Sequence, residues 1–413
     1  MNTELIGVLV LAVVFVLASV TGLNMGVLAL TATFLLGVVW LGHPAKEVLA
    51  GFPAEMFVVL VAVTFLFGMA RANGTVDWMV HSAVRAAGNR VEVVPWVLFL
   101  LATLLCATGA ASPAAVAIVA PIGITFAVRH GMSPLYAGLM AVNGAAAGSF
   151  APTGILGGIV HSSLAANDLH VDGAALFGGT FAINLAAAFV TWLLFGRRRR
   201  TVATPATDVD APAATSPALN AEQGATLLAM ALLVLGTTVL SLDTGLFALT
   251  LAAALATAFR PTAQRAAKEI AWPVVLLVCG IVTYIALLQK LGVVDSLGET
   301  IAAVGAPLMA ALLICYVGGV VSAFASTTGI LGALMPLATP FLASGSITTT
   351  GLVVALASAS TIVDASPFST NGALVVANAP EPLRSDTYRN LLRWGAGVCA
   401  IAPGAAWLAF VVI

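Results

Sequence analysis

Long apolar runs, separated by short polar segments, make up most of this chain. Unbroken runs lie at about 5–20, 24–41, 55–72 and 174–195 in the first half, and at 224–241, 243–259, 270–289 and 390–412 in the second. A helix needs about 20 mainly apolar residues to cross the hydrocarbon core of a bilayer. The pattern therefore predicts an all-α polytopic membrane protein.

Two further regions each pair shorter apolar runs. Apolar arms flank TGAASP (108–113) within 93–128, and ASTTG (325–329) within 307–342. Each arm has about 15 residues, fewer than the roughly 20 that a full crossing requires. Two short arms around a tip of small residues predict one re-entrant hairpin in each half.

Two longer apolar regions contain a polar interruption. GSFAPTG (148–154) divides 134–165, and VDASPFSTNG (363–372) divides 349–378. Proline does not fit a helix interior, and irregular backbone at membrane depth is tolerated only where it is buried in protein or lines a cavity. A simple proline kink, with its freed backbone groups satisfied by serine and threonine, is the alternative. The same construction occurs twice, which favours broken helices that hold a polar ligand.

The composition narrows the class of protein further. Apolar residues make up 61% of the 413 residues and charged residues 8%, which excludes a soluble domain of this length. The formal net charge of −1 provides no basic field for nucleic acid. The four cysteines lie in apolar runs without paired spacing, so we expect buried hydrophobes rather than disulfides or metal ligands. Without a basic segment before it, 5–20 is expected to be a retained span.

The chain divides into two similar halves. Residues 1–200 form repeat 1, residues 224–413 form repeat 2, and the Ala-, Thr- and Pro-rich segment 201–223 is a cytoplasmic linker that follows four arginines. Gly74 and Asp77 precede Gly292 and Asp295 by 218 residues, and the pairs Pro121–Pro336 and Pro152–Pro367 are 215 apart. The polar stretches 73–89 and from 291 onward are expected to lie along the interface.

The predicted topology inverts the second half relative to the first. Each half has five full crossings, one re-entrant hairpin and an interfacial helix, and an odd number of crossings turns the following half over. Placing the linker in the cytoplasm puts the following basic residues inside with its four arginines: Arg71, Arg85, Arg90, Arg129, Arg260, Arg265, Lys268, Arg384, Arg389 and Arg393. Only Lys46 and Lys290 of the 16 basic residues then fall outside. The expectation is a multi-pass inner-membrane protein with both termini outside.

Inverted repeats with broken helices are typical of secondary transporters, in which the breaks meet at the substrate site. Hydroxyls and the N-termini of half-helices, expected at Gly154 and Gly372, can hold carboxylate oxygens. The candidate substrate ligands are Ser112, Thr153, Ser326, Thr327, Thr328, Ser369, Thr370 and Asn371. The candidate cation ligands are Ser112, Asn143, Ser149, Ser326, Asp364 and Ser366.

A coupling cation is expected because these segments contain no lysine or arginine to balance a bound dianion. Carbonyl and hydroxyl oxygens suit sodium. Proton coupling is the alternative, and it would need a titratable group such as Asp364 or His161. No other cofactor is expected.

The order of spans, hairpin tips and broken helices resembles the ion transporter superfamily. Within it, the chain resembles the divalent anion–sodium symporters, and more closely the bacterial dicarboxylate carriers of the malonate carrier type. The resemblance implies an elevator-type homodimer, a small dicarboxylate such as malonate or succinate, and sodium as the coupling ion. The unbroken spans 5–41 and 224–259 would form the scaffold, and 55–195 and 270–412 the transport elements. The symporters' Ser-Asn-Thr tip signature is replaced by Ala-Ser-Pro (111–113) and Ser-Thr-Thr (326–328), which leaves the substrate and the number of cations open.

Other classes of protein fit the sequence less well. An intramembrane enzyme would need a nucleophile–base pair or a metal cluster, and the sequence contains no HExxH motif, paired aspartates or Cys/His constellation. We therefore expect no enzymatic activity. A channel would need a continuous polar lining. Within transporters, a cation/proton antiporter or a proton-coupled carrier of another organic anion remains the alternative.

Overall fold

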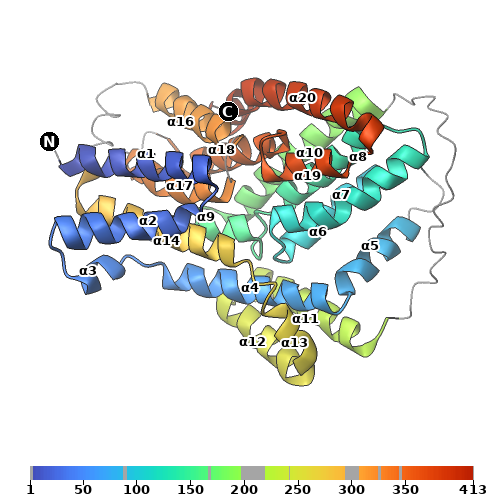
Figure 1. Cartoon of the computed structure of the whole chain (residues 1–413), viewed down its shortest axis with the longest axis horizontal. Helices are drawn as coiled ribbons and strands as arrows, with labels where there is room; N and C mark the ends of the chain where they lie inside the picture. The colour runs from blue at the N-terminus through green and yellow to red at the C-terminus, as the bar shows by residue number, and fades with distance from the viewer. Residues whose placement is uncertain are drawn as a thin grey trace.

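The computed structural model describes residues 3–86, 91–165, 169–196, 219–240, 242–293, 307–323, 327–343 and 347–412. Over these residues the protein is helical and contains no strand, which confirms the expected all-α class (Figure 1). Seven of the described helices are long and apolar enough to cross a membrane. Shorter apolar helices include Val94–Ala107 and Pro307–Ser322, the first arms of the two expected hairpins. The second arm of the first hairpin, Ser112–Arg129, is longer than the expected 15 residues and is one of the seven.

The described residues of the first half form ten α-helices. They are α1 (Thr3–Thr21), α2 (Met25–Thr33), α3 (Ala45–Leu49), α4 (Ala54–Ala72), α5 (Thr75–Ala86), α6 (Val94–Ala107), α7 (Ser112–Arg129), α8 (Pro134–Gly148), α9 (Ile155–Ala165) and α10 (Gly173–Thr191). Wider π-helical turns extend α2 to Trp40 and α10 to Gly196.

The described residues of the second half follow the same order. They form α11 (Ala221–Thr238), α12 (Thr244–Ala258), α13 (Arg260–Ala266), α14 (Trp272–Lys290), α16 (Pro307–Ser322), α17 (Thr327–Ala343), α18 (Thr349–Ile362), α19 (Thr370–Asn378) and α20 (Glu381–Trp407). π-Helical turns extend α20 to Val412. Most of the interfacial piece expected after 291, and residues 197–218 of the linker region, lie outside the described residues.

Helix boundaries follow the apolar runs except where polar residues are themselves helical. The last helix begins at Glu381, nine residues before the predicted 390, because its polar first turns are helical too. The short helices α3 and α13 were not predicted, since neither contains an apolar run of its own. In contrast, α4 and α14 both end before a glycine in the left-handed region, Gly74 (φ 78°) and Gly292 (φ 73°), as is common at helix C-termini.

Helix α8 is the buried centre of the first half, with all of its residues buried. Gly144 and Gly148 lie four residues apart on the face toward α6. A Cβ atom would lie 2.2 Å from the Phe99 carbonyl oxygen at Gly144, and 2.1 Å from that of Thr103 at Gly148. Small residues at this spacing allow two membrane helices to approach backbone to backbone. The first hairpin is thereby packed against the broken helix.

The two hairpins lie in opposite halves of the molecule. In Figure 1, α6 and α7 lie on the right, while α16 and α17 lie on the left. The broken helices run between them, with α9 and α18 on the left and α8 and α19 on the right. Helix α7 packs against α8 and α19, and α17 packs against α14 and α9, so each hairpin contacts both halves of the chain.

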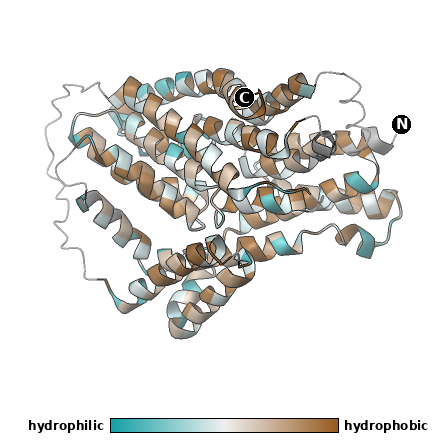
Figure 2. Ribbon diagram, turned by 180° about the vertical axis from the view of Figure 1, so that it is seen from behind, coloured by the Kyte–Doolittle hydropathy of each residue, from teal (hydrophilic) through white to brown (hydrophobic). Residues whose placement is uncertain are grey.

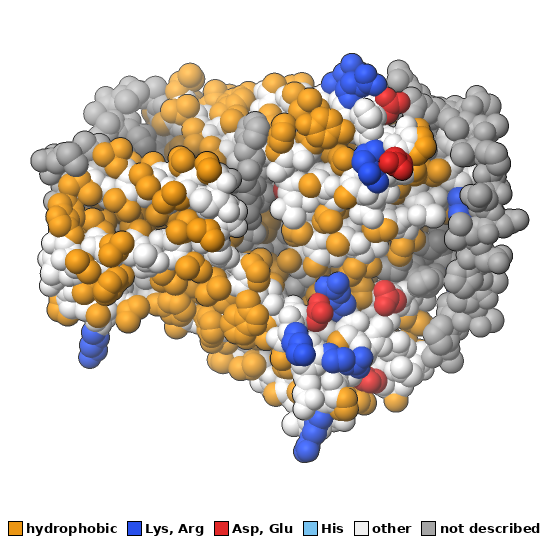
Figure 3. Space-filling view, in the orientation of Figure 1, with side chains coloured by type: hydrophobic (Ala, Val, Ile, Leu, Met, Phe, Trp, Pro, Cys, Tyr) orange, Lys and Arg blue, Asp and Glu red, His pale blue; other side chains and the backbone are white. Residues whose placement is uncertain are grey.

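The outer surface is apolar along the helices. Figure 2 shows hydrophobic residues predominating along the long helices. Exposed large side chains include Val16 and Leu17 of α1, Leu228 and Leu235 of α11, and Leu246 of α12. Figure 3 shows basic side chains concentrated on the right and around α13. An apolar surface with basic residues gathered toward one side suits a multi-pass membrane protein.

Candidate functional site

The second broken helix has an ordered, capped interruption. Helix α18 ends at Ile362, a single 3₁₀ turn covers Val363–Ala365, and α19 begins at Thr370. Ser369 is the N-cap, and its Oγ accepts a hydrogen bond from Gly372 N at 3.1 Å. The half-helix therefore begins two residues before the predicted Gly372, because Ser369 supplies the cap.

Two serine side chains fix the backbone of this break. Ser366 Oγ donates to Ala323 O at the end of α16 (2.6 Å) and accepts from the N–H groups of Phe368 and Ser369 (3.3 and 3.2 Å). Ser369 Oγ contacts the backbone carbonyls of Asp364 and Ser366. Both serines were candidate ligands, and in this conformation their hydroxyls serve the backbone of the break.

Close backbone contact also shapes the break at Gly372. A Cβ atom there would lie 1.8 Å from the Ser366 carbonyl oxygen. The corresponding contact in the first half is Gly157, whose Cβ would lie 2.5 Å from the Ala151 carbonyl oxygen. Both glycines allow the half-helix to fold back on the interrupted segment.

We therefore expect Gly372→Ala to destabilise the protein by about 1–3 kcal/mol, the usual cost of overpacking. Thermal unfolding of the purified protein measures this loss. Gly332→Ala is the matched control, because nothing lies within 4 Å of a Cβ atom at Gly332. An equal Tm for the two variants would contradict the close contact at Gly372.

Asn371 connects the break to the first hairpin. Its Nδ2 donates to Asp364 Oδ2 at 2.9 Å and to Ser112 Oγ at 2.8 Å. Ser112 is the first residue of α7, so the tip of the first hairpin meets the broken helix of the second half. Asn371 is fully buried, whereas the Asp364 side chain is half-buried. We name Ser112, Asp364 and Asn371 the central cluster.

The second hairpin reaches the same carboxylate. Thr327 is the first residue of α17, and its hydroxyl lies beside the Asp364 carboxyl group. Thr327 Oγ1 is also 2.8 Å from Ser322 Oγ and 3.4 Å from the Ser360 carbonyl oxygen. Ser326 lies outside the described residues, and the side chains of the half-buried Thr328 and the exposed Thr370 make no hydrogen bond within the described part of the chain. The starts of α7, α17 and α19 thus converge on Asp364.

Three buried side-chain oxygens of α18 and α19 lack a hydrogen-bond partner in the described part of the chain. Asn371 Oδ1 and the hydroxyls of Ser358 and Ser360 are buried, and none finds a hydrogen-bond partner among the described residues. Buried polar atoms are normally satisfied, so the unpaired Asn371 Oδ1, in the same side chain that bonds Asp364, is an acceptor available to a bound cation. Ser358 and Ser360 were missed by the sequence analysis, although ASAST (357–361) interrupts an apolar run.

Polar side chains of the first break are bonded within their own half. Ser149 Oγ donates to Ala145 O at 2.7 Å, and Thr153 Oγ1 donates to Ala107 O near the tip of the first hairpin. Asn143 Nδ2 lies 3.5 Å from Thr191 Oγ1 on α10. No described hydrogen bond joins these three residues to the central cluster. His161 lies on α9 next to Gly173, away from the central cluster's hydrogen bonds.

The hydrogen-bond donors at the central cluster suit the oxygens of a bound anion, and its acceptors suit a cation. The starts of α17 and α19 lie at Asp364 and the start of α7 lies at Asn371, so helix N-termini and hydroxyl groups gather at the central cluster. No group of three or more His, Cys, Asp or Glu residues that could hold a transition metal occurs among the described residues. The arrangement can bind carboxylate oxygens and a hard cation.

Comparisons with known proteins show similarity to carriers, in sequence over the first 149 residues and in fold over the whole chain. Residues 1–149 match the family model described as the N-terminus of the dicarboxylate carrier protein MatC. The fold is similar to the crystal structure of the Alcanivorax borkumensis YdaH transporter, with a TM-score of 0.63 and 16% identity over 99% of this chain and 98% of that one. No curated protein sequence matches the chain. The resemblance to dicarboxylate carriers is thus confirmed for residues 1–149, and the likeness to the YdaH transporter shows a shared fold over the whole chain.

Proposed function

We propose that this protein, whose first 149 residues match the dicarboxylate carriers, is a secondary active carrier of a small dicarboxylate such as malonate or succinate. The transport is coupled to a cation, with sodium favoured over a proton. The observation that carries the proposal is the central cluster, where the hairpin of one half meets the broken helix of the other.

Charge balance supports coupling to a cation. Asp364 is negative when ionised, and no lysine or arginine occurs in the described parts of the hairpin tips or of the two breaks. A dicarboxylate bound there would face an uncompensated carboxylate in a region of low dielectric, which is costly. A cation held by Asp364 and Asn371 Oδ1 removes this repulsion and links its own binding to that of the substrate. The substrate's oxygens are then free to accept from the helix starts and the Thr327 hydroxyl.

The proposal includes two inverted-topology repeats that move as an elevator. The starts of α7, α8 and α9 (112, 134 and 155) each precede those of α17, α18 and α19 (327, 349 and 370) by 215 residues. The opposite placement of the two hairpins in Figure 1 supports inversion. Helices α1, α2, α11 and α12 contain no break, so we assign the static scaffold and a homodimer interface to them.

Ligand-dependent thermal stabilisation tests the proposal. Purified protein is heated with malonate, succinate, tartrate or citrate, in sodium chloride and in choline chloride. We expect one of the shorter dicarboxylates to raise the Tm in sodium and to have little effect in choline, because the cation must bind first or together with the substrate. Equal stabilisation in both salts that changes with pH would favour proton coupling. No stabilisation by any of the four acids would contradict the assigned substrate class.

Cysteine labelling tests the topology. In a background without Cys399, the half-buried native cysteine, we expect Lys46→Cys in α3 to be labelled by an impermeant maleimide from outside intact cells. Gln264→Cys in α13 should be labelled only after the membrane is opened. Both positions are exposed, so a difference reports the side of the membrane. Labelling of both from outside would overturn the orientation.

A further inference from the structure

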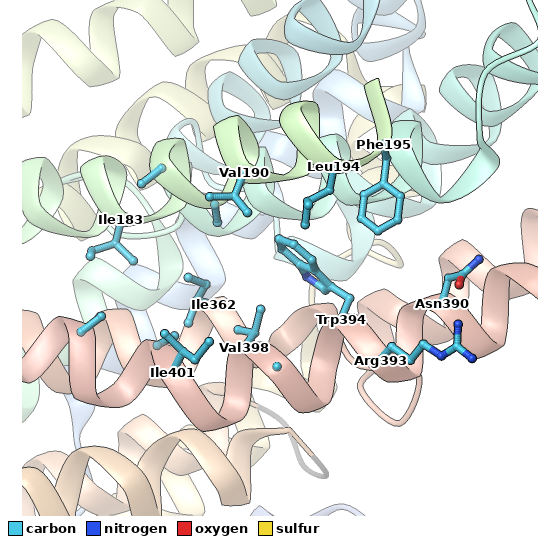
Figure 4. A pocket seen from close by; sticks show the side chains of 15 residues that line it. Ile183, Val190, Leu194, Phe195, Ile362, Asn390, Arg393, Trp394, Val398 and Ile401 are labelled. Carbon is cyan, nitrogen blue, oxygen red and sulfur yellow. The ribbon is translucent and has the colours of Figure 1, made fainter. Parts of the chain in front are cut away.

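A groove separate from the central cluster lies between α10 and α20. Its volume is about 570 Å³, within the ~300–1,000 Å³ range of small-molecule sites. Ile183, Val190 and Leu194 of α10 face Val398 and Ile401 of α20 across it, and Ile362 at the end of α18 also lines it (Figure 4). Exposed fractions of 43% for Val190 and 70% for Ile401 show that this groove is open on its outer side.

The polar groups of the groove are concentrated at one end. Asn390 and Arg393 lie there together, next to Trp394 and Phe195, while the opposite end at Ile183 and Ile401 is apolar (Figure 4). The rings of Phe195 and Trp394 meet edge to face, with centroids 6.2 Å apart. Tryptophan beside a basic residue is typical of the level of lipid headgroups. The groove therefore has the polarity of one phospholipid: a basic headgroup end and an apolar chain end.

We propose that the groove between α10 and α20 binds an anionic phospholipid of the surrounding bilayer. Its phosphate contacts Arg393 and Asn390, and one acyl chain lies between α10 and α20 as far as Ile401. Charge complementarity favours this occupant over a protein helix, because the sole formal charge among the lining residues is the Arg393 guanidinium. The bound acyl chain would contact Ile362, two residues before Asp364, and so pack against the broken helix on its groove side.

Native mass spectrometry of the purified protein tests the site with two probes, dioleoylphosphatidylglycerol and dioleoylphosphatidylcholine, added in equal amounts. One basic residue attracts an anionic lipid by about 1 kcal/mol, so we expect about fivefold stronger retention of phosphatidylglycerol. In Arg393→Gln this preference should fall close to one, and Arg393→Lys should keep most of it. Arg384→Gln is the matched control, an exposed arginine of the same helix that does not line the groove.

A second variant tests the apolar part. Gly397 lines the groove and nothing lies within 4 Å of a Cβ atom there, so the backbone accepts a side chain, and Gly397→Phe should occupy the groove and reduce retention of both lipids. Gly178→Phe in α10 is its control, equally open but outside the groove.

Unchanged retention in Gly397→Phe would overturn the assignment of the groove. Unchanged preference in Arg393→Gln, or an equal loss in Arg384→Gln, would overturn headgroup recognition at Arg393. Loss of the dimer, rather than of lipid, in Gly397→Phe would show that a second protein chain occupies the groove and would overturn the choice of occupant. The measurement involves no transport, so its failure is distinct from a failure of the proposed carrier function.

Discussion

Asp364→Asn is expected to raise the sodium concentration for half-maximal dicarboxylate uptake by about tenfold or more. The carboxylate would lose its negative charge while keeping its shape and most of its hydrogen bonds, including that from Asn371. An interaction with a charged group contributes about 1.5–3 kcal/mol, and 1.4 kcal/mol is a factor of ten in affinity. Sodium titrations of uptake into proteoliposomes, with Tm as the measure of folding, give the result.

Asp172→Asn is the matched control for this prediction. Asp172 caps α10 by accepting from Ala174 N at 3.0 Å, and asparagine caps a helix about as well as aspartate. If Asp364 carries a proton instead, Asp364→Asn should lose the pH dependence of uptake and keep its sodium response. A variant with wild-type sodium and pH responses and only a lower Tm would reduce Asp364 to a structural role in the break.

Asn371→Ala is expected to lower uptake at subsaturating substrate by about 10- to 100-fold. The amide is buried and donates to both Asp364 and Ser112, so its removal takes one donor from each. Losing a hydrogen bond to a charged group costs about 1.5–3 kcal/mol. Asn378→Ala is the control, because Asn378 lies in the same helix and donates only to Leu374 O within it.

A double-mutant cycle separates loss of the Asn371–Ser112 hydrogen bond from general destabilisation of the protein. Ser112→Ala alone should weaken substrate binding, but it should have little further effect in the Asn371→Ala background, because the two residues share one hydrogen bond. Additive losses would show that Ser112 acts independently of Asn371. Thr327→Val tests the tip of the second hairpin in the same assay. Unchanged uptake kinetics in both Ser112→Ala and Thr327→Val would show that the hairpin tips are structural turns that do not bind substrate.

The sequence by itself determined where the helices are and where they break. Helix α4 begins one residue from its predicted start, and α18 begins at the predicted 349. Both are set by the length of an apolar run, which is a local property of the chain. The breaks were equally visible, because proline and clustered polar residues cannot continue a helix through an apolar region without a compensating partner.

Only the tertiary structure decided which polar residues meet. Asn371 and Ser112 are 259 residues apart, and their hydrogen bond depends on the rotation of α19 relative to α7. The same rotations turn Asn143 toward α10 and leave Ser149 bonded to its own helix. Apolar spacing specifies a buried face only coarsely, and a hydrogen bond requires a donor and an acceptor to meet within a few tenths of an ångström. The groove between α10 and α20 is likewise a product of packing, since each helix alone is an ordinary apolar span.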